Sequence, residues 1–147
     1  MDIPERPTAG LVIRYAFLWR DEADDGREEA RKDRPAAVVV AIPKDDRTQV
    51  IVAPITHSPP DDSAAAIELT ADVKRQLGLD DATSWLRADE LNRFTWPGYD
   101  LRPVPGRDTV VYGKLPPGLY TQLKNRIVEI ERAAREGRKP RRIVDRD

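Results

Sequence analysis

The hydrophobic pattern of this chain is strongest in two apolar runs that a short polar break separates. Residues 32–42 and 48–60 are rich in valine, isoleucine and alanine, and residues 43–47 between them have the composition of a turn. This pattern predicts a buried antiparallel hairpin. Arg34 opens its first strand, and Thr56 and His57 close its second. Because the start of one hairpin strand lies beside the end of its partner, we expect these polar groups to meet in space.

Shorter apolar segments predict the other strands. Residues 11–19 are aromatic and β-branched on both faces, which predicts a first strand buried inside a barrel. Further strands are expected at residues 66–69, 83–89 and 109–112. Residues 89–96 lead into a turn at Pro97 and Gly98, which a proline-rich loop follows through residue 106.

Two helices are predicted. The first covers residues 71–77, where Thr70 provides a cap and Gly78 a stop. The second begins at the prolines of residues 115–118 and ends at Gly137. Its apolar positions share one face that can cover an open side of a barrel: Leu119, Leu123, Ile127 and Ile130.

Several short strands with one long helix near the C-terminus predict a mainly β fold with minor α. We expect a small, strongly bent SH3-like β-barrel with a long C-terminal helix and a short internal helix. At 147 residues the chain has the length of one domain, and we expect a core over about residues 10–136 with polar tails at residues 1–9 and 138–147.

Charge and composition limit the kinds of site that the chain can form. The 25 basic and 26 acidic residues nearly cancel, so no global field attracts nucleic acid, and any anion site must be local. The chain has no cysteine and one histidine, which excludes disulfides, thiolate metal sites and multi-histidine metal centres within one chain. We find no apolar signal region and no run near the ~20 residues that span a bilayer, so we expect a cytoplasmic protein.

Residues 20–33 form a long charged connector with seven acidic and four basic side chains. The spacing of Glu28 and Lys32 favours a short helix within it, which Gly26 interrupts. A connection of this length is expected to be a functional lid or a disordered loop.

Four motifs occur in an order that resembles the MazF/PemK/Kid family of toxin endoribonucleases, over roughly residues 10–130. Lys32-Asp33-Arg34-Pro35 precedes a valine-rich strand, and Val50-Ile51-Val52-Ala53-Pro54-Ile55-Thr56 forms the next one. Gly78-Leu79-Asp80 then precedes Ser84-Trp85-Leu86, and Tyr112-Gly113-Lys114-Leu115 leads into the C-terminal helix.

The resemblance implies a homodimer, without cofactor or metal, that cleaves single-stranded RNA such as mRNA within a type II toxin-antitoxin system. In that chemistry the 2′-hydroxyl attacks its neighbouring phosphate and leaves a 2′,3′-cyclic phosphate and a 5′-hydroxyl. A cognate antitoxin protein would fill the RNA groove. The acidic connector is longer than the family's substrate loop, and it would repel RNA unless it moves or pairs with its own bases.

The resemblance also implies the catalytic residues. Arg34 matches the arginine of the family's Arg-Pro motif, Thr56 matches its threonine, and Arg87 and Asp89 resemble the Arg-x-Asp pair of the Kid branch. Because the pKa of arginine lies above ~12, we assign Arg34 and Arg87 to charge on the phosphoryl oxygens and Thr56 to positioning.

The general base is either Asp89 or His57, since histidine is the side chain whose ordinary pKa lies nearest neutrality. Each candidate also has a structural alternative. His57 can cap the end of its strand, Arg34 can simply flank a strand, and Arg87 can form a solvated pair with Asp89.

RNA binding needs base-stacking rings beside positive charge. The predicted contacts are Trp19, Arg20, Lys32, Ser58, Asn92, Arg93, Trp96 and Tyr99. A basic cluster at residues 135–142 either grips phosphate or solvates the end of the helix.

Two other functions fit the same fold. One is a catalytically silent SH3-like module that binds a protein or peptide through Trp19, Trp96 and Tyr99. The other is a poison of a topoisomerase, because the related CcdB toxins share the barrel without the ribonuclease activity. Fold alone does not choose among them.

Overall fold

The computed structural model describes residues 1–27, 32–137 and 143–147. Its strands are β1 (Leu11–Tyr15), β2 (Arg34–Lys44), β3 (Arg47–Thr56), β4 (Ala66–Glu68), β5 (Trp85–Arg87), β6 (Leu91–Trp96), β7 (Val111–Lys114) and β8 (Ile143–Asp145). Its helices are α1 (Arg20–Asp24), η1 (Ser63–Ala65), α2 (Ala71–Leu77) and α3 (Pro117–Arg135). The mainly β fold is confirmed.

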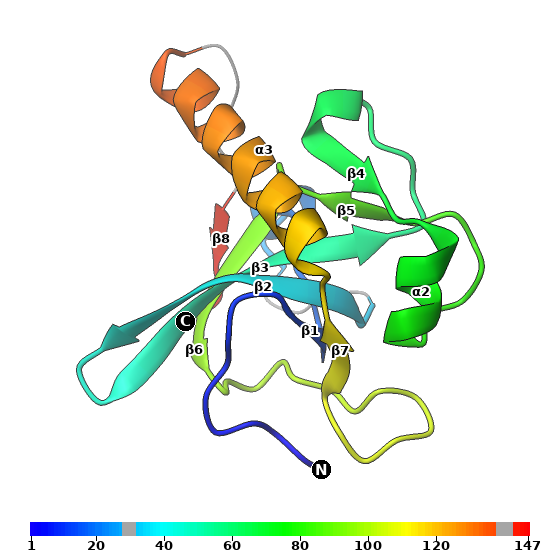
Figure 1. The fold of residues 1–147 in the computed structure, drawn as a ribbon. Coiled ribbons are helices and arrows are strands. Elements are labelled where there is room, and N and C mark those ends of the chain that lie inside the picture. Colours follow the sequence, from blue (N-terminus) through cyan, green and yellow to red (C-terminus); the bar gives the residue numbers. More distant parts are fainter. Residues whose placement is uncertain (28–31, 138–142) are drawn as a thin grey trace.

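The strands form one bent sheet in the order β4-β5-β3-β2-β1-β7, with β6 pairing β3 and β8 pairing β6. All of these pairs are antiparallel except β6 with β8. Within the described ranges β4 and β7 do not pair with each other, so the barrel is not closed. Figure 1 shows the β2–β3 hairpin running through the centre of the molecule with α3 lying across it.

The inner half of the central hairpin is apolar on both faces because both faces are buried there, whereas residues 42–47 at its tip are exposed. Ala37 and Val39 of β2 pack into one hydrophobic cluster, whereas Ala36 and Val38 pack into a second cluster on the opposite face. Successive side chains of a strand point to opposite faces, so residues 36–39 alternate between the clusters, and the register shift between Val38 and Val40 places Val39 and Val40 on the same side. This confirms the predicted buried hairpin.

The predicted ends of the internal helix and the predicted apolar face of the C-terminal helix are also confirmed. Thr70 Oγ1 accepts a hydrogen bond from the amide of Val73 at 3.2 Å, and α2 ends at Gly78, whose φ of +69° is left-handed. In α3, Leu123 is fully buried, and the other three apolar positions of its predicted face pack partly buried against the same cluster.

The structure differs from the sequence prediction in several places, including the short helices α1 and η1, which were not predicted at these positions. The first strand ends at Tyr15 rather than at residue 19. Residues 91–96, predicted only as a lead into a turn, form β6 along β3. The predicted polar tail does not hold for residues 143–147, because β8 pairs with β6. Residues 28–31 of the acidic connector and 138–142 of the basic cluster lie outside the described residues.

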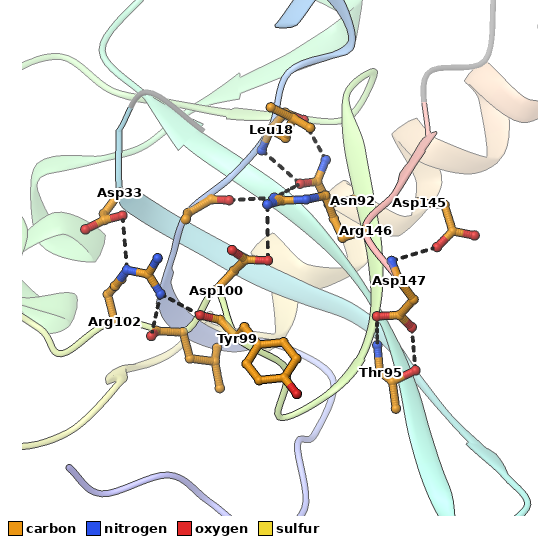
Figure 2. Close-up of polar contacts among 12 residues, drawn as sticks. Leu18, Asp33, Asn92, Thr95, Tyr99, Asp100, Arg102, Asp145, Arg146 and Asp147 are labelled. Atoms are coloured by element: carbon orange, nitrogen blue, oxygen red, sulfur yellow. Dashed lines mark hydrogen bonds and ion pairs between the residues drawn. The ribbon is translucent and has the colours of Figure 1, made fainter. Parts of the chain in front are cut away.

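A buried arginine holds the C-terminal strand in place (Figure 2). Arg146, whose side chain is 5% exposed, donates to the Ala16 carbonyl at 2.7 Å and forms an ion pair with Asp100 at 3.1 Å. It also donates to Asn92 Oδ1, which itself accepts the amide of Leu18 at 2.9 Å. These contacts link β8 to the segment that follows β1 and to the loop after β6.

None of the helices within the described ranges combines the length and apolar composition that crossing a bilayer requires.

We predict that Arg146→Ala lowers the free energy of unfolding by about 3 kcal/mol, because it leaves Asp100 without its buried partner. The control is Arg93→Ala. The side chains of Arg93 and Asp145 are 34% and 51% exposed, so loss of this pair is expected to cost less than about 1 kcal/mol. Urea denaturation of both variants checks this, and equal losses would contradict it.

Candidate active-site pocket

The two polar ends of the central hairpin meet as the sequence predicts. The register pairs Ala36 with Pro54, which places Arg34 beside Thr56. Arg34 Nη1 donates to Thr56 Oγ1 at 3.2 Å, and the Ser58 amide donates to the same oxygen at 3.2 Å. Thr56 is 4% exposed, so this hydroxyl fixes both the guanidinium and the chain that leaves β3.

A pocket of about 450 Å³ opens at this end of the hairpin. Five of the predicted site residues line it: Lys32, Arg34, Thr56, His57 and Ser58. Its walls also come from β1, from the loop that follows α2, and from β7. The five predicted residues all come from the ends of the hairpin, and segments distant in sequence complete the walls of the cavity.

Arg34 is a partly buried cation of this pocket that no described carboxylate pairs directly. Desolvation by burial lowers the pKa of its guanidinium, and the nearby Glu22 carboxylate opposes this more weakly. Within the described residues Arg34 forms no ion pair, and its buried Nε has no hydrogen-bond partner. A partly buried cation without a paired carboxylate favours an anionic ligand.

Arg87 lies outside the pocket and is neutralised by Asp89. Arg87 Nε and Nη2 donate to the two Asp89 oxygens at 2.8 Å each. The hydrogen bond to Asp89 is the largest reason why the pKa of Arg87 is raised. Neither side chain lines the pocket. The predicted pairing on one face is therefore present, but the structure does not bring this pair into the cavity with Arg34.

Trp19 connects the two arginines. The guanidinium carbons of Arg34 and Arg87 lie 5.0 Å and 5.6 Å from the centre of its ring, and Phe17 contacts it edge-on at 5.2 Å. Cations over an indole face are attracted by its quadrupole. The ring that we expected to stack on an RNA base therefore has cationic partners within the protein.

The other predicted RNA contacts are scattered. Asn92 is fully buried and Trp96 is 7% exposed, with its Nε1 donating to the Pro4 carbonyl, so the prediction of RNA contacts there was wrong. Arg20 pairs with Asp24 in α1, and Arg93 pairs with Asp145 of β8. Tyr99 is 98% exposed, but it does not line the pocket.

His57 has an acidic partner that the sequence prediction missed. Its Nε2 lies 3.1 Å from Asp80 Oδ1, and both side chains line the pocket. The sequence signal was present, since Asp80 follows the Gly-Leu that ends α2, but that motif had no role assigned.

Arg14 was also missed. It lines the pocket, and its Nη1 donates to Tyr112 Oη at 2.8 Å. Arg14 is the one charged residue in the apolar run of residues 11–19, and alternation places it on the face opposite Ile13 and Tyr15.

The charge of the pocket is locally positive. Its cations are Arg14, Lys32 and Arg34, and its carboxylates are Asp33 and Asp80. Asp33 lies 3.8 Å from the guanidinium of Arg102 (Figure 2). The overall charge of the chain is balanced, so we expected any anion site to be a local group of cations. The cations of this pocket form such a group. Across the described ranges, no three His, Asp or Glu side chains gather as metal ligands.

No family model, curated protein or solved structure matches this chain in the comparisons with known proteins.

We predict that Thr56→Val destabilises the fold by about 1–3 kcal/mol, because a buried methyl replaces the acceptor of Arg34 and of the Ser58 amide. Thr56→Ser keeps the oxygen and should lose less than about 1 kcal/mol. Urea denaturation measures both losses. A valine variant as stable as the wild type would show that the hydroxyl is not needed.

Proposed function

We propose that this protein is an endoribonuclease that cleaves single-stranded RNA through attack of the 2′-hydroxyl on the adjacent phosphate. The observation that carries the proposal is Arg34, a partly buried guanidinium without an ion pair among the described residues, which Thr56 fixes in a locally positive pocket. The order of motifs that resembles the MazF/PemK/Kid toxins supports the same activity.

The chemistry needs positive donors where negative charge develops on phosphorus. Arg34 meets this need, because its planar fork matches two phosphoryl oxygens and its site is partly desolvated. Thr56 keeps the fork in one orientation. Arg87 is less suited to the reacting phosphate, since Asp89 neutralises its charge and accepts from its Nε and Nη2.

Arg14 and Lys32 are suited to the flanking phosphates of an RNA chain. Both line the same pocket as Arg34 but come from other segments, β1 and the residues just before β2. Cations along a groove bind a single strand through its backbone. As in the family that this chain resembles, the proposal includes a homodimer and a cognate antitoxin that covers the groove.

The alternative of a silent peptide-binding module required three exposed aromatic side chains. Trp96 is buried, and Trp19 packs against two arginines and Phe17. Tyr99 alone is fully accessible. The pocket therefore favours the nuclease over this alternative.

We predict that Arg34→Ala slows cleavage of a mixed single-stranded RNA by about 10²–10³-fold, because a donor to the developing charge is lost. Arg34→Lys should be intermediate, since it keeps the charge and loses the fork. The assay contains EDTA and detects a 2′,3′-cyclic phosphate at the new end.

The control for Arg34→Ala is Arg107→Ala, which removes an equal charge from an exposed position outside the pocket. It should stay within about twofold of the wild type. Failure of folded wild-type protein to cleave RNA would refute the proposed function. Cleavage that Arg34→Ala leaves unchanged would refute the site.

We predict that Arg14→Ala raises KM about tenfold and changes kcat less than about threefold, because one charge-assisted contact to a flanking phosphate is lost. The slope of log KM against log salt should fall by about 0.7. Tyr112→Phe keeps the cation and should retain the salt slope. A loss in kcat at unchanged KM would contradict this role.

A further inference from the structure

The loop that follows α2 is held unusually firmly for a surface loop. Lys74, which is 9% exposed, donates its Nζ to the carbonyls of Asp81 and Ala82 at 3.2 Å and 3.0 Å. The Ala82 amide donates to Asp80 Oδ1 at 3.1 Å. The left-handed Gly78 turns the chain from α2 into this loop. Together these contacts fix the position of the Asp80 carboxylate.

The Asp80 oxygen that this loop fixes is the one that lies 3.1 Å from His57 Nε2. A carboxylate only accepts hydrogen bonds, so Nε2 carries a proton. In the neutral imidazole the second nitrogen, Nδ1, is then the unprotonated one and can accept a proton.

Stability does not account for this arrangement. The His57 and Asp80 side chains are 61% and 58% exposed, and exposed ion pairs contribute little to stability. A buried lysine and a shaped loop nevertheless fix the acid. Such a dyad is the arrangement in which an acid orients a histidine for proton transfer.

The location of the dyad also suits catalysis. His57 follows Thr56 directly, and it lines the same pocket as Arg34. The other candidate base, Asp89, lies outside the pocket with both oxygens bonded to Arg87. The pocket therefore supplies its own base.

We propose that His57 is the general base of this pocket and that Asp80 is its positioning residue. His57 Nδ1 takes the proton of the 2′-hydroxyl, the bond from the 2′-oxygen to phosphorus forms, and the bond from phosphorus to the 5′-oxygen breaks. The leaving 5′-oxygen takes a proton from water, and the proton on Nδ1 returns to solvent. This inference rests on the proposed function and deepens it.

The first test reads the histidine directly. Because the chain has one histidine, a long-range proton–nitrogen NMR correlation of ¹⁵N-labelled protein gives a single imidazole pattern. In the neutral ring we expect the proton on Nε2 in the wild type and a mixture of tautomers in Asp80→Asn. That variant keeps an acceptor for the Ala82 amide. A proton on Nδ1 in the wild type would overturn the proposed role of Asp80.

The second test is kinetic. His57→Ala should slow cleavage at saturating RNA about 100-fold or more, and added imidazole should restore part of the rate. Asp80→Asn should lower kcat about tenfold at similar KM, and Asp80→Glu should recover part of the loss. The control is Asp81→Asn, which removes the same charge from the next, exposed residue and should stay within twofold.

The charge control separates catalysis from binding. Removing the negative charge of Asp80 makes the pocket more positive, which by itself favours RNA and negative charge in the pocket. A lower kcat in Asp80→Asn is the opposite of this electrostatic effect, so it would come from the loss of the histidine's partner. Wild-type cleavage with unchanged rates in His57→Ala would overturn the dyad and leave the nuclease intact. No cleavage by folded wild-type protein would overturn the nuclease and the catalytic dyad together.

Discussion

The rest of the structure depends on the burial of both faces of the β2–β3 hairpin. Successive residues such as Val38 and Val39 enter different hydrophobic clusters. A shift of the register by one residue would therefore move each of these side chains into the other cluster. The core therefore fixes the register of the hairpin. That register in turn sets Arg34 beside Thr56, so the geometry of the pocket follows from packing outside it.

Two arginines near one indole ring differ in the partners of their guanidinium groups. Arg34 and Arg87 both lie over Trp19. Asp89 compensates Arg87, whereas Thr56 gives Arg34 only a neutral hydroxyl. The sequence does not distinguish the two side chains, because each belongs to a motif that resembles the same family: Arg34 to Arg34-Pro35, and Arg87 to Arg87-Ala88-Asp89. The three-dimensional structure shows that Asp89 pairs with Arg87, whereas Arg34 has no ion pair among the described residues.

The elements predicted correctly are those whose signals are local. The hairpin is marked by its apolar runs, and α2 by Thr70 and Gly78 at its ends. β8 was missed because its pairing with β6 depends on a strand distant in sequence and on the buried contacts of Arg146. In the site, Arg34 and Thr56 followed from hairpin geometry. Asp80 did not, because its relation to His57 arises from the fold of a separate loop.

The position of α2 within the topology separates the acid beside His57 from the strands that carry Arg34 and Thr56. The helix and its loop lie in the connection between β4 and β5, two strands that pair with each other directly. Shortening this connection to a turn would keep the pairing of the two strands, but it would remove Leu77, which is 1% exposed in the hydrophobic cluster that also contains Ile67 and Leu86. The Asp80 carboxylate beside His57 is therefore carried by a connection that also contributes to the core. Substitutions in the loop of this connection can therefore change the partner of His57 without altering the hairpin that holds Arg34 beside Thr56.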